Sequence, residues 1–243
     1  MKVIVATSDK TSHILPAFEF LMDKYCPELS DIYILGYSVF PKLGDKYRCI
    51  SLHHEQKSIQ DWCGRLHDYI AQFDDEYVIF GLEDLLPVQP IDYEIFNAGY
   101  GIMKMNSQIA RYELGIGHCW HVDITPIENS PFYLYGKKSL YRISTQWAIW
   151  RRAYLLEYLK HGWSAWDFEI EGSRIAATDG RDVMCGNFAH AWHWVHSALS
   201  GKYPDKVNVM DIKRSDIEEM IALGILDRSK LQVGIELNSP AYE

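Results

Sequence analysis

Short apolar runs alternate along the chain with longer stretches in which apolar residues recur every three or four positions. The runs are typical of buried strands, and the longer spacing is typical of helices that cover a sheet. The strand pattern is found at 3–6, 32–35, 47–52, 77–82, 132–135 and 142–150. The helical pattern is found at 14–25, 58–73, 92–114, 151–160 and 189–199, and again from 215 to a stop at Gly224.

Two of the predicted helices carry N-terminal signals. Ser58 is the expected N-cap of the second helix, and Ser215 with Glu218 has the spacing of a capping box for the last. Strands and helices follow one another without a repeat, a low-complexity segment or a long linker. This order predicts one α/β domain with a mostly parallel central sheet flanked by helices and elaborated in its second half.

Composition narrows the classes of function. The 243 residues include 33 acidic and 24 basic side chains, which gives a net charge of −9 and disfavours binding to nucleic acid through its phosphates. No apolar run reaches the roughly 20 residues of a membrane span. Five cysteines without a C-x-x-C pair argue against disulfides and thiolate zinc sites. Because the N-terminus enters a strand directly, without a secretory signal, we expect a cytoplasmic protein.

Two adjacent acids, Glu83 and Asp84, follow the most apolar predicted strand, 77–82. Ligands of parallel sheets bind at the carboxyl ends of strands. Carboxylate oxygens suit Mg²⁺ or Mn²⁺ that carries a substrate diphosphate, because such ions take one or two protein carboxylates together with phosphate and water. The pattern therefore indicates a metal site, and a solvated strand end is the alternative.

A second group of acids alternates with aromatic residues in Trp166-Asp167-Phe168-Glu169. Aromatic faces contact the C–H groups of sugars, and a carboxylate can take the proton of an attacking hydroxyl. Acids two positions apart point to different faces of a helix, so that only one would face a reaction if this segment is helical. The alternative is that the rings are core and the acids cap a helix.

Three segments together resemble the GT-A type nucleotide-sugar glycosyltransferases, in particular a group found in bacterial polysaccharide clusters and in large viruses. Thr7-Ser8-Asp9-Lys10 resembles the group's Thr-x-Asp-Lys opening, and Glu83-Asp84-Leu85-Leu86 resembles its acidic metal-binding segment. Arg142-x-Ser144-x-Gln146-x-Ala148-Ile149-Trp150, followed by Ser164-Ala165-Trp166-Asp167-Phe168-Glu169-x-x-Gly172-Ser173, resembles its Ser-x-Gln and Trp-Glu-Phe-Glu pattern. The match covers roughly residues 3 to 175.

The resemblance implies a GT-A-like (Rossmann-like) fold over 1–243, with a nucleotide-sugar-binding half at 1–115 and an acceptor-binding half at 116–243. It implies a metal carboxylate at Asp84, assisted by Glu83. The chain has Glu at the first acidic position and Leu85 at the third, so that a strict Asp-x-Asp is absent. The residues implied to lie near the donor are Thr7, Asp9, Lys10, Glu83, Arg142, Ser144 and Gln146.

On the acceptor side the resemblance implies Trp166, Asp167 and Glu169, with Glu169 as the base and Asp167 as the second choice. It implies a hexosyltransferase-like enzyme that uses Mn²⁺ or Mg²⁺, a nucleotide-sugar donor (a UDP-sugar first of all) and a glycan or polysaccharide acceptor. A carboxylate opposite the leaving group would give inversion at the anomeric carbon. If no carboxylate reaches the hydroxyl, retention is the alternative.

Other functions stay open on the sequence. The departure at Glu83 fits a non-catalytic sugar-nucleotide or carbohydrate-binding protein on the same fold. The acidic cluster also fits a metal-assisted phosphoester hydrolase. A transferase that modifies bases in DNA is disfavoured by the net charge.

Three histidines recur every third residue, at His190, His193 and His196. On the helix predicted for 189–199 they would spread over about 200° of the circumference, which disfavours a three-histidine metal site. The resemblance leaves room for one of them as a late ligand of the metal.

Overall fold

The structure is a computed structural model that describes residues 1–53, 58–115, 123–186, 190–198 and 206–232. A nine-stranded sheet forms its centre in the order β3-β2-β1-β4-β9-β6-β10-β8-β7. The pairings give seven strands one direction, and only β9 and β8 run the opposite way. The predicted α/β class with a mostly parallel sheet is therefore confirmed. The strands are β1 (Lys2–Ala6), β2 (Ile32–Gly36), β3 (Tyr47–Ser51), β4 (Tyr77–Leu82), β6 (Ile109–Glu113), β7 (Ile124–Pro126), β8 (Tyr133–Tyr135), β9 (Ala148–Arg151) and β10 (Asp182–Cys185).

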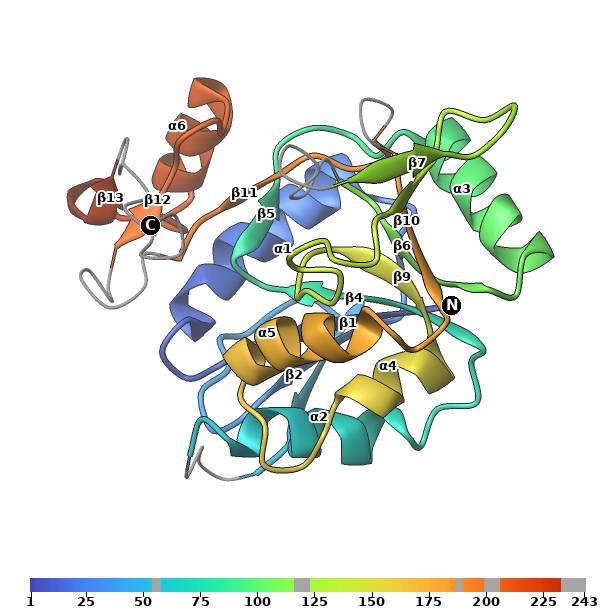
Figure 1. Ribbon diagram of the computed structural model, residues 1–243. Helices are drawn as coiled ribbons and strands as arrows, with labels where there is room; N and C mark the ends of the chain where they lie inside the picture. Colours follow the sequence, from blue (N-terminus) through green and yellow to red (C-terminus); the bar gives the residue numbers. More distant parts are fainter. Residues whose placement is uncertain (54–57, 116–122, 187–189, 199–205, 233–243) are drawn as a thin grey trace.

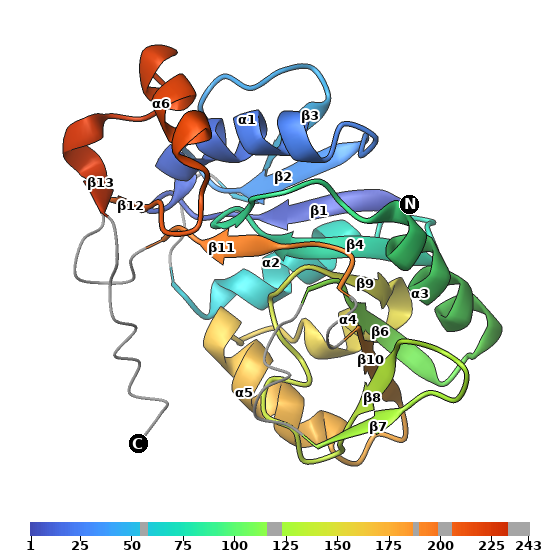
Figure 2. The same cartoon turned by 90° about the horizontal axis from the view of Figure 1, so that it is seen from above.

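Helices cover both faces of this sheet (Figures 1 and 2). One face packs against α1 (Leu15–Tyr25), which follows a short 3₁₀ turn at Ser12–Ile14, and against α3 (Tyr93–Met105). The other face packs against α2 (Asp61–Ile70), α4 (Arg152–Tyr158) and α5 (Ala165–Ala176). Alternate residues of β1 enter the two cores, Val3 and Val5 on the α1 side and Ile4 and Ala6 on the α2 side, as the period of a strand requires.

Two short ladders lie outside the main sheet. β5 (Leu85–Pro87) pairs antiparallel with β11 (Trp194–His196), and β12 (Val207–Asn208) pairs with β13 (Leu231–Gln232), which follows a 3₁₀ turn at Arg228–Lys230. The last helix, α6 (Arg214–Ala222), packs beside α1, where buried Asp216 accepts hydrogen bonds from Tyr25 and pairs with Lys24. None of the helices in the described ranges is both long and apolar enough to cross a membrane.

The sequence placed most of the first six elements correctly, and the later ones needed correction. The helix predicted for 92–114 ends at Met105, because Asn106 turns the chain by accepting a hydrogen bond from the Gln108 N–H, and 109–113 is strand β6. The strand predicted for 142–150 begins only at Ala148. The helix predicted for 189–199 is wrong over 190–198, because residues 194–196 complete a ladder with β5, and positions 189 and 199 lie outside the described residues.

Two predicted helix starts were also wrong. α2 begins at Asp61, and the Ser58 hydroxyl accepts a hydrogen bond from the Gln60 N–H ahead of the helix. α6 begins at Arg214, so that Ser215 lies inside the helix and caps nothing. The predicted stop at Gly224 is confirmed, since its φ of +72° is a conformation that favours glycine.

Candidate active site

The acidic pair lies in the tight connection between β4 and β5, at the carboxyl end of a central strand. Glu83 is 3% exposed, and its N–H donates to the Ala6 carbonyl oxygen at the end of β1. The Trp147 indole supports the connection by donating from Nε1 to the Leu85 carbonyl oxygen at 3.0 Å. Asp84 Oδ1 is buried and has no hydrogen-bond partner among the described residues. A buried carboxylate oxygen without a donor is suited to bind a cation.

Burial dominates the electrostatics of both acids. It raises the pKa of Glu83, which the adjacent Asp84 charge raises further, while the hydroxyls of Thr11 and Thr7 favour the charged form. Burial also raises the pKa of Asp84, against an opposing effect of His196. Two carboxyl groups held this close out of water gain stability when a cation shares their surroundings.

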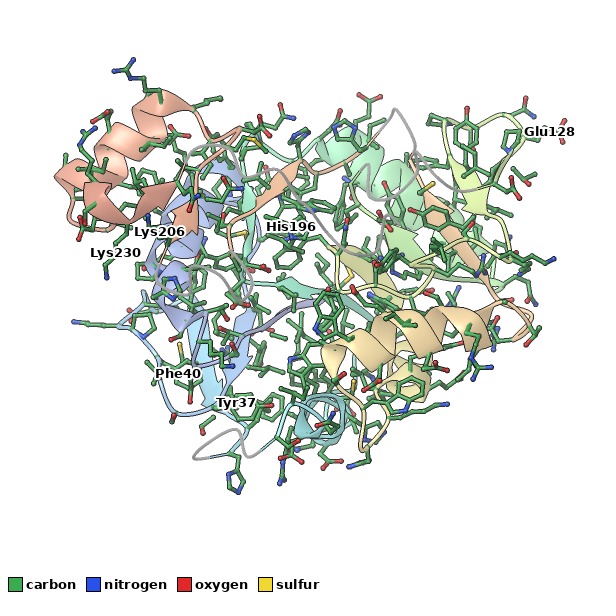
Figure 3. The ribbon with its side chains drawn as sticks, turned by 60° about the vertical axis from the view of Figure 1, so that its left-hand side comes forward. Tyr37, Phe40, Glu128, His196, Lys206 and Lys230 are labelled. Carbon is green, nitrogen blue, oxygen red and sulfur yellow. The ribbon has the colours of Figure 1, made fainter. Side chains whose placement is uncertain are left out.

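His196 is brought to Asp84 by the β5–β11 ladder. His196 pairs with Leu85 in the antiparallel register, and the N–H of Ser197 donates to the Asp84 carbonyl oxygen at 2.7 Å. The His196 side chain is exposed, and Figure 3 marks it on β11. Of the three histidines considered from the sequence, His196 is the one that the ladder places beside Asp84.

Glu169 is the second carboxylate whose pKa His196 affects. It lies on α5, and its Oε1 accepts hydrogen bonds from the Thr145 N–H at 2.7 Å and from the Thr145 hydroxyl at 2.8 Å. Burial raises the pKa of Glu169, while these two bonds and the charges of His196 and Arg111 oppose the rise. Because His196 opposes the rise in the pKa of both Asp84 and Glu169, the two carboxyl groups are candidates for one site.

Asp167 and Trp166 precede Glu169 on the same helix and differ in their surroundings. Asp167 forms a capping box with Ser164: its carboxylate accepts from the Ser164 N–H at 2.8 Å and from the hydroxyl at 2.6 Å, and its own N–H donates back at 3.1 Å. The bonds from Ser164 lower the pKa of Asp167. Asp167 thus starts the helix, whereas Trp166 leaves 60% of its surface exposed and is available to a ligand.

The loop after β1 lies at the same edge of the sheet. Asp9 accepts hydrogen bonds from the N–H groups of Ser38 and Val39, each at 2.9 Å, and from the Ser38 hydroxyl. Burial alone would raise the pKa of Asp9, but these bonds lower it below its ordinary value. Asp9 therefore joins the loops after β1 and β2. Thr7 is buried and Lys10 is exposed.

The three residues expected near the donor from the Ser-x-Gln segment are buried. The Arg142 guanidinium donates to the carbonyl oxygens of Tyr135, Gly136 and Arg181 at 2.8 to 3.1 Å and is wholly out of reach of solvent. Ser144 accepts a hydrogen bond from Arg111 at 2.7 Å. Gln146 is buried as well. Arg142 and Ser144 thus hold the segment that presents Thr145 to Glu169.

Sequence reasoning missed three residues of this site. Thr145 lies between Ser144 and Gln146 in the Ser-x-Gln segment, and this position was the sequence signal that could have pointed to it. Arg111 and Glu113 form a fully buried ion pair at 3.0 Å beneath that segment, but they fell in a stretch expected to be helical. All five residues of β6 are buried, and the alternation of apolar and charged residues from Ala110 to Leu114 was the sequence signal available for a strand.

The available donor set fits a divalent cation. Asp84 offers a carboxylate oxygen without a protein partner among the described residues, and His196 offers an exposed imidazole. One carboxylate with one imidazole suits Mn²⁺ when phosphate oxygens and water complete the coordination shell. Glu83 lies beside them but is directed toward the hydroxyls of Thr7 and Thr11.

Neither a protein-family model nor a curated protein matches the sequence. Among solved structures, the chain is similar to the mannosyltransferase PcManGT from Pyrobaculum calidifontis in complex with GDP-Man and Mn²⁺, with 10% identity and a TM-score of 0.51 over 83% of this chain and 58% of that chain. CMP:2-keto-3-deoxy-manno-octonic acid synthetase with CTP matches at 10% identity and a TM-score of 0.43, over 76% and 88% of the two chains. The first similarity shows a GT-A-like fold.

Proposed function

We propose that this chain is a metal-dependent glycosyltransferase that moves a sugar from a nucleoside diphosphate to a hydroxyl of a glycan. The observation that carries the proposal is the β5–β11 ladder, which places His196 beside Asp84 at the carboxyl end of β4. The same histidine opposes the burial-raised pKa of Glu169, so that a candidate metal carboxylate and a candidate base are both within electrostatic reach of one imidazole. Residues 1–115 are proposed to bind the donor, and 116–243 the acceptor.

Asp84 and His196 would hold Mn²⁺ or Mg²⁺, with Glu83 in support. The ion would neutralise charge that develops on the departing diphosphate. The loop of Thr7, Asp9 and Lys10 lies at the same sheet edge, where the exposed Lys10 would meet donor phosphates.

Glu169 would act as the base. Both hydrogen bonds from Thr145 go to Oε1, which fixes the carboxylate and leaves Oε2 to take the proton of the acceptor hydroxyl. A carboxylate with a pKa raised by burial is a stronger base than an exposed one. Displacement from the face opposite the diphosphate would invert the anomeric carbon, with the exposed Trp166 ring as a platform for the acceptor sugar.

The fold supports this proposal. The similar mannosyltransferase was solved with a nucleotide sugar and Mn²⁺, both of which the proposed site would accommodate. A UDP-sugar is our first choice of donor, and GDP-mannose is the next to test.

A panel of nucleotide sugars tests the proposal, first by thermal stabilisation with and without Mn²⁺ and then by transfer to a mixture of glycan acceptors. A bound donor raises the melting temperature by mass action. We expect a Mn²⁺-dependent shift that Asp84→Asn abolishes, and a Glu169→Gln variant that binds donor but transfers about 10²–10⁴-fold more slowly.

The alternatives give different results in the same assays. Donor binding without turnover by any acceptor would identify a non-catalytic binding protein. Release of phosphate from simple diesters, without sugar transfer, would identify a hydrolase. Equal Mn²⁺ dependence in the wild type and in Asp84→Asn would remove the metal role of Asp84.

A further inference from the structure

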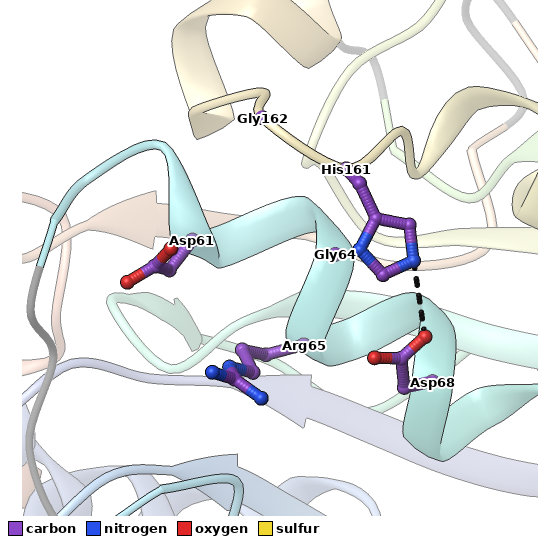
Figure 4. Close-up of a pocket in the computed structure, with 6 residues that line it drawn as sticks. All are labelled: Asp61, Gly64, Arg65, Asp68, His161 and Gly162. Atoms are coloured by element: carbon purple, nitrogen blue, oxygen red, sulfur yellow. Dashed lines mark ion pairs between the residues drawn. The ribbon is translucent and has the colours of Figure 1, made fainter.

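A second group of metal-binding side chains lies on the outer side of α2. His67 and Asp68 come from this helix, and His161 comes from the connection between α4 and α5. The Asp68 Oδ1 atom is 3.3 Å from His67 Nδ1 and 3.1 Å from His161 Nε2 (Figure 4 shows the second pair). Among the residues that the structure describes, no other three such side chains bring their ligand atoms within 4.8 Å of one another.

These distances match the coordination shell of zinc. With ligands about 2.0–2.2 Å from the ion, neighbouring ligand atoms of a tetrahedron are about 3.4 Å apart. The two measured distances are close to that value before any ion is added. We propose that His67 Nδ1, Asp68 Oδ1 and His161 Nε2 form a binding site for Zn²⁺, separate from the Asp84 site.

Close packing holds the third ligand in place. His161 lies directly over Gly64 of α2, where an added Cβ would be 2.6 Å from the imidazole Nδ1. The neighbouring chain is tied to the same helix, because the Cys63 N–H donates to the Trp163 carbonyl oxygen at 3.1 Å. Ligands from two elements are thus brought together before the ion binds, which lowers the cost of ordering them.

The surroundings favour a cation with an open position. Within the described residues, the Asp68 carboxylate lies within 3.3 Å of these two imidazoles, and neutral imidazole is the form that binds metal. A hollow of about 160 Å³, lined also by Arg65 and Gly162, borders Asp68 and His161. It offers room for water or a small anion as the fourth ligand.

Bound Zn²⁺ would join α2 to the connection that leads into α5. That connection ends at Ser164, the N-cap of the helix that carries Glu169. The site therefore links a helix of the proposed donor half to the helix with the proposed base, although it uses none of the residues of the proposed function. Its test is independent of that function.

The experiment measures Zn²⁺ binding by calorimetry and Co²⁺ binding by its visible absorption, in the full chain with Asp84→Asn so that the first site does not contribute. We expect one Zn²⁺ per chain and the intense absorption of tetrahedral Co²⁺. His67→Gln and His161→Gln should each weaken binding at least about tenfold. His13→Gln, which removes an exposed histidine elsewhere, should leave the affinity unchanged.

Gly64→Ala adds a test that keeps all three ligands. The new methyl group would displace the His161 imidazole, and we expect weaker Zn²⁺ binding with an unchanged far-UV spectrum. Equal affinity in the parent and in both His→Gln variants, or tight binding with octahedral Co²⁺ absorption only, would overturn the proposal.

Discussion

The N–H of Ser197 donates a hydrogen bond to the carbonyl oxygen of Asp84 at 2.7 Å. This bond joins the end of β11 to the turn after β4, two segments that are far apart in the sequence. It fixes the register in which His196 stands opposite Leu85, next to Asp84. A late segment of the chain thereby completes a site begun by the first half.

His196→Gln tests whether this imidazole is a metal ligand. Glutamine keeps a polar side chain of similar length but is a much poorer ligand for Mn²⁺. We expect the Mn²⁺ concentration that gives half of the donor stabilisation to rise at least about tenfold, because one of the two proposed protein ligands is lost. A titration of Mn²⁺ at constant nucleotide sugar, followed by melting temperature, measures the effect.

His193→Gln is the matched control. His193 directly precedes β11. Its backbone carbonyl oxygen accepts a hydrogen bond from the Val88 N–H, and the substitution retains this bond. Donor stabilisation in His193→Gln should depend on Mn²⁺ as it does in the wild type. If His193→Gln loses the dependence and His196→Gln keeps it, the ligand assignment is incorrect.

Asp167 and Glu169, both on α5, are expected to have different roles that single substitutions can distinguish. Asp167→Asn weakens the capping box with Ser164 and should lower the free energy of unfolding by about 1 kcal/mol, with little change in the rate of transfer. Glu169→Gln should slow transfer by about 10²–10⁴-fold at nearly unchanged donor affinity. Urea unfolding and initial rates, measured on both variants, make the comparison.

The opposite pattern would reassign the base. A large rate loss in Asp167→Asn with normal stability would place the base at Asp167. Ser164→Ala is the control for the capping box alone, because it removes the hydroxyl that donates to Asp167 and leaves both acidic residues in the sequence.

Local pattern was sufficient for most of the elements up to residue 82. The strand predicted for 77–82 is observed with these same bounds, because a near-continuous apolar run, of which the first five residues are buried, leaves little choice of structure. Prediction failed where pairing with a segment distant in the sequence determines the secondary structure. Residues 194–196 are a strand because β5 offers them a free edge, and nothing within 189–199 reports the existence of that edge.

The site was predictable in part for the same reason. Acids after an apolar strand indicated Glu83 and Asp84, and the structure places them at the end of β4. The choice among three histidines depended on the β5–β11 register. Arg142 is an arginine that satisfies three carbonyl oxygens inside the protein, and a sequence gives no sign of whether a cation is used in this way or by a ligand.

Thr145→Val tests the pKa control of Glu169. As the proposed base, Glu169 would work only as a carboxylate, so that activity should fall as the pH drops through its pKa. Burial raises this pKa, and the Thr145 hydroxyl lowers it by donating to Oε1. Valine removes that donor, and the acid limb of the kcat/KM profile should therefore move to higher pH.

Thr145→Ser is the companion variant, since serine retains a hydroxyl and should retain the profile of the wild type. Profiles that coincide for valine and serine would show that the hydroxyl does not set the ionisation of the base. A shift to lower pH with valine would contradict the sign derived from the hydrogen bond.

The buried pair of Arg111 and Glu113 gives a prediction about stability. Arg111 is 0% exposed, donates to Glu113 and Ser144, and lies over the Trp150 ring at 5.1 Å. Arg111→Met leaves the Glu113 carboxylate buried without its partner, and we expect a loss of about 3–5 kcal/mol in the free energy of unfolding. Denaturant unfolding monitored by tryptophan fluorescence measures this loss.

Removing both charges should cost less than removing the arginine alone. In Arg111→Met with Glu113→Leu no uncompensated charge stays in the core, so that part of the lost stability returns even though two side chains have changed. Simple addition of the two single losses would mean that the pair is not coupled. Because Arg111 also holds Ser144, next to Thr145, the double variant should still transfer sugar more slowly than the wild type. Recovered stability without recovered rate would show that this buried arginine both compensates the Glu113 charge and positions the segment that orients Glu169.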